Sequence, residues 1–266
     1  MNNILRKAPL LLGFVLTASM AQSPLSVFIE ELTWVEVQEA IDQGKTTIIL
    51  PTGGTEQNGP HMVLGKHNYL VNYKAGEIAN QLGDALVAPV VAYVPEGDID
   101  PPTSHMRFAG TISIPEDVFA DILEFSARSF KQHGFLDIAF LGDSGGNQAA
   151  QKIIAEKLNE EWTETKVRVH HVSDFYPGRG DNWVISQNIS EEDVGGHAGT
   201  HDTSSLLYLN PSMLRLDQMK LGRPGDGQGH TGNPAVSTPE FGERILEMQI
   251  EDAVDQITKE RLASRQ

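Results

Sequence analysis

The sequence predicts an α/β fold, a three-layer α/β/α sandwich in which helices cover both faces of a mainly parallel central sheet. Short β-branched, apolar runs alternate along the chain with longer stretches of helical periodicity, which is the order that βαβ units produce. The chain has 266 residues, of which 39% are hydrophobic, so it is long enough to bury one large core. Neither a repeat nor a long linker interrupts the sequence after residue 30.

Four strands are predicted from apolar runs that end at turn residues. The first is a β-branched run that stops at Pro51, and the third leads directly into a glycine-rich turn. The predicted strands are 46–50, 85–93, 137–141 and 166–172. Ligands bind at the carboxyl ends of the strands in sheets of this kind, so the polar segments after the first and third strands are the candidate site.

Five helices are predicted between and after the strands. The clearest start is Ile114-Pro115-Glu116-Asp117, because proline fits the first turn and acidic residues favour the positive end of the helix dipole. That helix is expected to end near Gly134. The predicted helices are 32–43, 69–82, 114–133, 147–161 and 204–209.

The first 21 residues have the pattern of a secretory signal peptide. Arg6 and Lys7 precede a short apolar stretch, and small residues follow up to Ala21, where a signal peptidase would cut. The apolar stretch is shorter than the roughly 20 residues that a membrane span needs, although an uncleaved anchor is the alternative. We therefore expect an exported protein, periplasmic or secreted, that leaves the membrane once the signal is removed.

The composition excludes several classes of function. Lys and Arg number 20 against 36 Asp and Glu, for a formal charge of −16, which argues against a nucleic-acid partner. The chain has no cysteine, so disulfides, thiolate metal sites and cysteine nucleophiles are excluded together. Any chemistry must use His, Asp, Glu, Ser or backbone groups.

The first polar segment follows the first strand and reads TGGTEQNGPH at 52–61, continuing to LGKHN at 64–68. It places Glu56, His61 and His67 in one short stretch. Oxygen and nitrogen ligands at this density suit zinc or manganese. The alternative is a polar loop whose side chains cap its own turns.

The second polar segment, GDSGGN at 142–147, matches the G-x-S-x-G pattern between a strand and a helix. Ser144 is therefore a candidate nucleophile. A later aspartate, Asp174 or Asp181, and a later histidine, His197 or His230, would complete its triad. The alternative is a glycine-rich turn where the backbone approaches a ligand.

The third polar segment is GHAGTHDTS at 196–204. If a helix begins by Ala198, His197 and His201 lie four residues apart on one face, a workable ligand spacing. Histidine also suits proton transfer, because it titrates near neutral pH. The alternative is that Asp202 and the hydroxyl residues after it cap the helix.

Three other histidines carry weaker signals. His105 lies in a loop, 102–111, that can reach the cleft. His170 and His171 are neighbours in a predicted strand, so one is expected in the core and the other at the surface or in the cleft.

Taken together, the motifs resemble those of the creatininase (creatinine amidohydrolase) family. The family pattern G-S-x-E-Q-H-G-P-H-L-P-L-G-T-D is matched by GGTEQNGPHMVLGKH, and G-H-A-G-x-x-E-T-S by GHAGTHDTS. The family's N-G-H-G-G-N corresponds to the segment 142–147, and H-x-x-F-x-G-T-x-S to HMRFAGTIS. The resemblance spans about residues 30 to 258, which we take as a single domain.

The resemblance implies a three-layer α/β/α domain that assembles as a homo-oligomer, a hexamer in this family, with metal at the strand ends. It implies hydrolysis of a cyclic amide or related C–N bond of a small molecule by metal-bound water. Glu56 corresponds to a metal-binding glutamate. His197 corresponds to the proton-transfer histidine, and Asp202 replaces a glutamate.

Other positions of the family's metal site are substituted in this chain. Asn58 stands where the family has a metal-binding histidine, and His67 where it has a bridging aspartate. Ser144 replaces another ligand histidine, and Gly146 stands where creatininase itself has a ligand glutamate. A rearranged centre, holding a single zinc or manganese ion, is therefore expected.

We predict an exported, metal-dependent amidohydrolase. The predicted metal ligands are Glu56, His67, Asp143 and His201. His197 is predicted to carry the proton to the leaving nitrogen, with Asp202 orienting it or binding the metal. The alternatives are an esterase or amidase with Ser144 as nucleophile, and a non-catalytic periplasmic protein that binds a small molecule.

Overall fold

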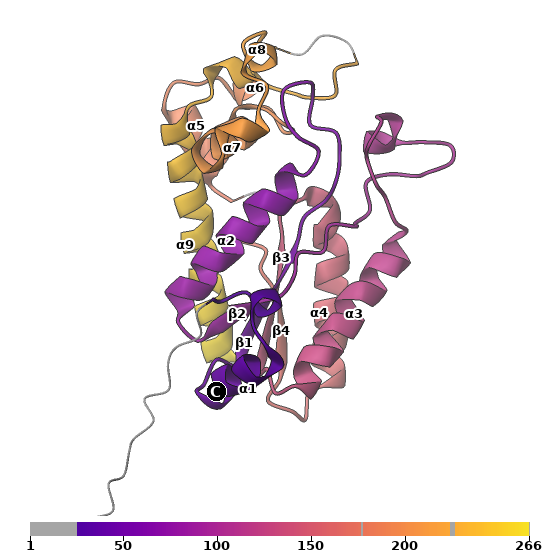
Figure 1. The fold of residues 1–266 in the computed structure, drawn as a ribbon, viewed down its shortest axis with the longest axis vertical. Coiled ribbons are helices and arrows are strands. Elements are labelled where there is room, and N and C mark those ends of the chain that lie inside the picture. Colours follow the sequence, from indigo (N-terminus) through magenta and orange to yellow (C-terminus); the bar gives the residue numbers. More distant parts are fainter. Residues whose placement is uncertain (1–25, 177, 224–226, 266) are drawn as a thin grey trace, which may run out of the picture.

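The computed structural model describes residues 26–176, 178–223 and 227–265, so the predicted signal peptide at 1–21 lies outside the described residues. Four parallel strands form one sheet in the order β2-β1-β3-β4 (Figure 1). The strands are β1 Thr47–Thr52, β2 Ala85–Val87, β3 Asp137–Gly142 and β4 Arg168–His171. Thr47 of β1 pairs with Ala85 on one side and with Asp137 on the other.

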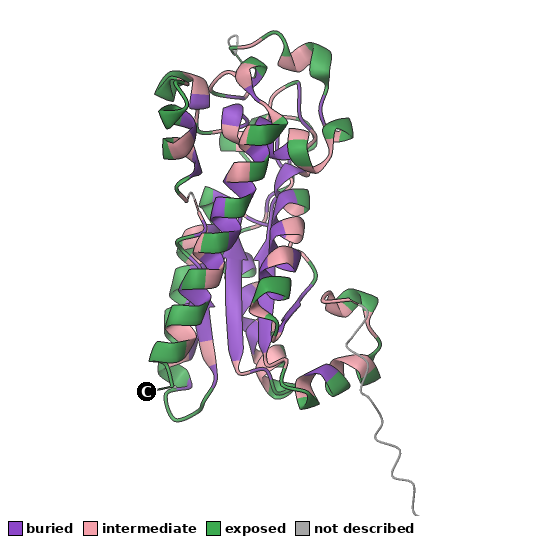
Figure 2. Cartoon of the chain, turned by 90° about the vertical axis from the view of Figure 1, so that its left-hand side faces the viewer, coloured by how far each residue is buried: buried purple, intermediate pink, exposed green. Residues whose placement is uncertain are grey.

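Helices cover both faces of this sheet, which confirms the predicted three-layer α/β/α architecture. One layer consists of α1 (Trp34–Asp42), α3 (Glu116–Gln132) and α4 (Gln148–Glu161), and the other of α2 (Lys66–Leu82) and α9 (Pro239–Ala263). Ile48 of β1 packs against the first layer and Ile49 against the second. The two central strands, β1 and β3, are buried along their whole length, as Figure 2 shows, and for this reason their middle residues, 48–51 and 138–141, are apolar.

A cap of short helices lies beyond the carboxyl ends of the strands (Figure 1). It contains α5 (Gly180–Ser186), α6 (Glu191–Val194), α7 (Thr200–Leu209) and α8 (Leu216–Met219). The cap is joined to the sandwich where α7 crosses α9. A Cβ atom on Gly242 would lie 2.0 Å from the carbonyl oxygen of Ser204, so only glycine allows the two helices to approach so closely.

The predicted strand at 85–93 was too long, because β2 ends at Val87. Ala88 still donates its backbone N–H to Ile49, and Val91 donates to Pro51. Pro89 between them has no N–H to donate, so the regular ladder is interrupted although the chain stays beside β1.

Two predicted helices start earlier than expected. Helix α2 begins at Lys66 rather than at residue 69, because its polar first turn is buried instead of exposed. Helix α7 begins at Thr200 rather than at residue 204. The long helix α9 was not predicted at all. No helix within the described residues is long and apolar enough to cross a membrane.

His170 ties α9 to the amino-terminal end of the sheet. Its Nε2 donates to Asp137 Oδ1 at 2.9 Å, and its Nδ1 donates to Glu260 Oε2 of α9 at 3.0 Å. Burial lowers the pKa of His170, but these two hydrogen bonds outweigh burial and raise it above its usual value. His171 is half-buried and bonds to Gln148, so the expected division between a core and an outer histidine is confirmed.

The raised pKa of His170 predicts a pH-dependent contribution to stability. A group whose pKa is higher in the folded state stabilises fully below its unfolded pKa, about 6.5 for histidine, and this contribution is lost as pH rises through the folded pKa. The free energy of unfolding in urea should therefore differ more between the wild type and His170→Gln at pH 6 than at pH 9. The exposed His133→Gln serves as control. An equal difference at both pH values would contradict the charged pairing.

Candidate functional site

A cavity of about 500 Å³ opens at the carboxyl edge of the sheet, beneath the cap. It is formed by the loops after β1 and β3, the start of α2 and the segment that leads into α7. All seven residues predicted to carry the chemistry line it, and these are Glu56, His67, Asp143, Ser144, His197, His201 and Asp202. The sequence thus located the site, and the contacts of each side chain decide what it can do.

The loop after β1 is held by buried polar side chains. Asn58, fully buried, donates its Nδ2 to the carbonyl of Glu56 at 2.9 Å and to that of Val63 at 3.2 Å. Asn58 therefore supports the loop from behind instead of facing the cavity. Gly54 has φ +156°, and a Cβ atom there would lie 2.3 Å from Glu96 Oε1, so glycine lets Glu96 pack against the loop.

The loop after β3 is held to the loop after β1 by Asn147. The Nδ2 of Asn147 donates to Thr52 Oγ1 at 2.9 Å and to the carbonyl of Gly53 at 2.8 Å. The loop before α7 is fixed similarly, since His61 Nε2 donates to the carbonyl of Ala198 at 3.0 Å. Buried amide and imidazole groups thus bring the three predicted polar segments together.

Ser144 lacks the surroundings of a nucleophile. It lies between β3 and α4, as the G-x-S-x-G pattern predicts, but its backbone is extended, with φ −124° and ψ 148°, rather than strained. Within the described residues, no hydrogen bond joins Ser144 Oγ to a histidine. A serine nucleophile needs such a base within reach, so the arrangement does not favour this alternative.

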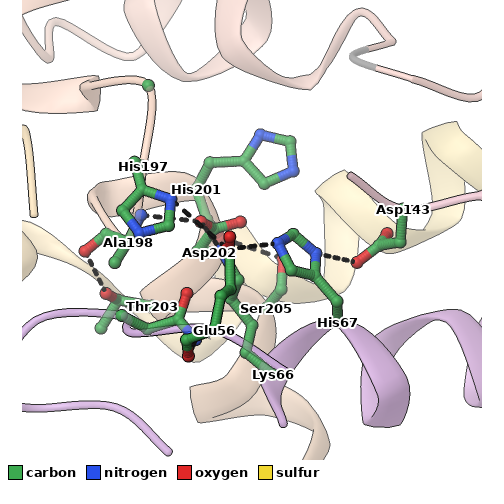
Figure 3. A network of polar contacts seen from close by, with 12 residues as sticks. Glu56, Lys66, His67, Asp143, His197, Ala198, His201, Asp202, Thr203 and Ser205 are labelled. Atoms are coloured by element: carbon green, nitrogen blue, oxygen red, sulfur yellow. Dashed lines mark hydrogen bonds and ion pairs between the residues drawn. The ribbon is translucent and has the colours of Figure 1, made fainter. Parts of the chain in front are cut away.

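His67 lies between two buried carboxylates (Figure 3). Its Nε2 donates to Glu56 Oε1 and its Nδ1 to Asp143 Oδ2, both at 2.8 Å. Burial and the charge of Lys66 lower the pKa of His67, but the hydrogen bonds to Asp143 and Glu56 outweigh them and raise it to about 9. Both ring nitrogens therefore carry protons, and neither offers an electron pair to a metal ion.

Two lysines that the sequence analysis did not assign to the site complete this network. Lys66 Nζ lies 2.6 Å from Asp202 Oδ2 and 3.8 Å from Glu56 Oε1. Lys74 Nζ pairs with Asp143 Oδ1 and donates to Gln249 at 3.1 Å. The available signal was their spacing, because lysines eight residues apart on one helix share a face, here a buried one.

A carboxylate and two imidazoles form a second cluster on the cavity side. Glu56 Oε2 lies 3.2 Å from His105 Nε2, and Glu56 Oε1 lies 3.6 Å from His197 Nδ1. One ligand atom of each residue lies within 4.8 Å of the others. Burial together with the charge of Lys66 lowers the pKa of both histidines, that of His197 to about 4, so both rings are neutral at pH 7.

His201 stands apart from both clusters. Its Nδ1 lies 2.5 Å from Asp181 Oδ1, and in Figure 3 its ring lies outside the network of dashed lines. The expected helical pairing of His197 with His201 was wrong. Ala198 has φ +51° and breaks the helical path, so His197 precedes α7 and does not share its face. Asp202 lies in the first turn of α7 and accepts the N–H of Ala198 at 2.8 Å, but the N-cap residue is Gly199 and no side chain caps the helix, so the capping expected as the alternative is not observed.

The four predicted metal ligands are therefore divided between different partners. Glu56, His67 and Asp143 do meet, but through protonated nitrogens of His67. His201 pairs with Asp181 instead. Among the described residues, the ligand cluster that the structure provides is Glu56 with His105 and His197. His105 was recognised only as a residue that can reach the cleft.

Comparisons with known proteins agree with this arrangement of motifs. The profile of the family described as "Creatininase: Creatinine amidohydrolase" matches residues 30–257. The chain belongs to the creatininase family. It is 29% identical over 234 residues to a mycofactocin precursor peptide peptidase of Mycolicibacterium smegmatis, covering 80% of this chain and 84% of that protein. It is 25% identical over 260 residues to a creatinine amidohydrolase of Pseudomonas putida, covering 88% and 97%.

Solved structures of creatininases have the same fold. A crystal structure of creatinine amidohydrolase superimposes with a TM-score of 0.71 at 23% identity and covers 89% of this chain and 98% of its own. A structure described as "Creatininase Mn" gives a TM-score of 0.69 at 26% identity and covers 88% and 98%. The resemblance inferred from the motifs is thus confirmed for the family and for the α/β fold.

The support of the first loop by Asn58 can be tested directly. Asn58→Ala removes the side-chain donor that three backbone carbonyls share, which should lower the free energy of unfolding by about 1–3 kcal/mol. Chemical denaturation measures this change. Asn72→Ala, at a half-buried position of α2 away from the cavity, is the control. A stability equal to that of the wild type would show that Asn58 does not hold the loop.

Proposed function

We propose that this creatininase-family protein hydrolyses a C–N bond of a small polar molecule with the help of one divalent ion, zinc or manganese. The observation that carries the proposal is the cluster of Glu56, His105 and His197 at the wall of the cavity. One carboxylate and two imidazoles are a ligand set that catalytic zinc sites use, with the remaining position open to water or substrate.

The cluster fits an ion in its spacing. Ligand atoms bound at about 2.0–2.1 Å to a tetrahedral zinc lie about 3.3 Å from one another. Here His105 Nε2 lies 3.2 Å from Glu56 Oε2 and His197 Nδ1 lies 3.6 Å from Glu56 Oε1, and one ligand atom from each of the three residues lies within 4.8 Å of the others. His197 Nε2 donates to the carbonyl of Gln57 at 2.9 Å, which leaves the Nδ1 electron pair facing Glu56. Two electron-pair donors that face each other across this distance favour a cation between them.

Glu56, His105 and His197 would hold the ion, and Gln57 would orient the two rings from behind. Its side-chain nitrogen donates to His105 Nδ1 at 2.9 Å, and its backbone carbonyl accepts from His197 Nε2 at 2.9 Å. A bound divalent ion supplies an activated water at neutral pH and polarises a substrate carbonyl. Groups behind the ligands fix ring orientation and are typically worth about 10–100-fold in metal affinity.

His201 is our candidate for proton transfer to the leaving nitrogen, in place of His197, which its hydrogen bond to Gln57 directs toward the ligand cluster. Asp181 fixes the His201 ring through Nδ1, and both residues line the cavity. A histidine oriented by a carboxylate in this way is suited to general acid–base catalysis. Asp202 is engaged with Lys66 and is proposed to position the loop before α7.

The size and lining of the cavity support a small substrate. A volume of about 500 Å³ lies in the range of small-molecule sites, and its wall is rich in charged and polar groups. One relative is named a peptide peptidase, so short peptides are the substrates with which small non-peptide molecules should be compared. The non-peptide C–N bond is our proposal, supported by the relative named a creatinine amidohydrolase.

Export and assembly are further parts of the proposal. The pattern of residues 1–21 supports a periplasmic or secreted protein, and family membership supports a homo-oligomer. N-terminal sequencing of the protein from the periplasmic fraction tests the first, with residue 22 as the expected start. Light scattering during size exclusion tests the second, with six copies expected from the resemblance.

The ion site predicts a defined metal content. Protein purified without chelator and dialysed against zinc should hold one ion per chain by elemental analysis. Glu56→Gln or His197→Ala should lose it, because each removes one of three protein ligands. The exposed His133→Ala should keep it. A wild type without metal would overturn the ion site.

The proton-transfer role predicts a different phenotype for His201. On a panel of cyclic amides and short peptides, with products identified by mass spectrometry, His201→Gln should lower turnover by about 10²–10⁴-fold. Its zinc content should equal that of the wild type, and Asp181→Asn should show a smaller loss.

Two results would instead support the alternatives. Labelling of Ser144 by a fluorophosphonate probe would favour the serine nucleophile. Thermal stabilisation by a panel compound without any product would favour a binding protein.

A further inference from the structure

We call the part of the cavity around Glu56, Asp143 and Asp202 its inner half, and the cluster of Glu56, His105 and His197 the outer site. The inner half contains more negative charge than one ion at the outer site would balance. Glu56 is 2% exposed and Asp143 is 4% exposed, and Asp202 lies beside them at the start of α7. Buried carboxylates are costly unless each has a partner of opposite charge. The structure provides those partners from within the chain.

Both partner lysines come from one helix. Lys66 and Lys74 lie two turns apart on α2, and their residues are 1% and 2% exposed. Lys66 contacts Asp202 and Glu56, while Lys74 contacts Asp143. The two ammonium groups and the three carboxylates therefore neutralise one another within the protein.

These contacts occupy the oxygens that a second metal ion would need. Lys74 is bonded to Asp143 Oδ1, and His67 is bonded to Asp143 Oδ2. Asp202 Oδ2 accepts from Lys66 at 2.6 Å and from the backbone of Ala198 at 2.8 Å. A divalent cation placed here would also meet the two ammonium groups at close range, which is repulsive at low dielectric.

We infer that Lys66 and Lys74 are built-in cations that exclude metal from the inner half of the cavity, so that removing the Lys74 ammonium creates a second metal site at Asp143. The site would take a divalent ion such as zinc, which would displace the proton on one ring nitrogen of His67 and gain Glu56 and His67 as the other ligands. This inference depends on the proposed function in one respect only, which is the number of metal ions that the wild type is expected to hold.

Methionine is the appropriate replacement, because its unbranched side chain keeps most of the lysine stem and lacks the charge and the three donors. Zinc content per chain is measured after dialysis for the wild type, Lys74→Met and Lys66→Met/Lys74→Met. We expect one ion in the wild type and two in both variants. Lys74→Arg, which keeps the charge, should hold one, and so should Lys45→Met, whose half-buried side chain donates to the carbonyl of Gly83 at the far end of α2.

The same substitution in a background without the outer site separates the two proposals. His105→Gln/His197→Gln should hold no zinc, and addition of Lys74→Met should restore one ion. If the wild type holds no zinc but this triple variant binds one, the outer site fails and the inference stands. If the wild type holds one ion and folded Lys74→Met gains none, the inference is overturned and the outer site stands.

Two further measurements test the inference if Lys74→Met does not fold. Asp143→Asn in the wild type should leave the single ion in place, because Asp143 is bonded to the chain's own cations. Loss of that ion would make Asp143 a ligand and overturn the inference. Two zinc ions in the wild type would overturn it as well.

Discussion

The constraint on which the site depends is the neutralisation of carboxylates that the fold has removed from water. Glu56 follows β1 and Asp143 follows β3, so parallel strands with buried carboxyl ends bring the two acids together. The nearest helix on that side, α2, supplies Lys66, His67 and Lys74 from its first three turns. The pairing of these cations with Glu56 and Asp143 explains why α2 begins at Lys66 and has a buried polar face. It also helps to fix the loop after β1.

The chain's own cations neutralise the inner carboxylates, and neutral hydrogen bonds hold the loops around them. Asn58 and Asn147 hold backbone carbonyls and hydroxyls behind the cavity, and His61 joins the first loop to the segment before α7. These are neutral hydrogen bonds in buried surroundings, where each missing partner would cost more than a surface contact contributes. Such a scaffold holds the cavity open before a ligand enters.

Glu56 lies between a charged histidine, His67, and two neutral histidines, His105 and His197. On its inner side it accepts from His67 within a closed set of charged pairs, and on its outer side it faces two neutral imidazoles. The difference between the histidines is set by partners. Carboxylates on both sides keep His67 charged, whereas burial beside Lys66 keeps His105 and His197 neutral. The electron pairs that remain for a metal ion, such as that of His197 Nδ1, therefore lie on the side of Glu56 that faces the cavity.

The sequence by itself determined the layers, the family and the location of the site, because these follow from local patterns. Strand alternation with helices and the polar segments at the strand ends were enough to place Glu56, His67 and Ser144 in one cavity. The sequence did not determine roles, because a histidine's chemistry depends on partners that are distant in the chain. Lys74 meets Asp143 across 69 positions. Only the tertiary structure decides which cation reaches which carboxylate, and therefore which electron pairs remain for a metal ion.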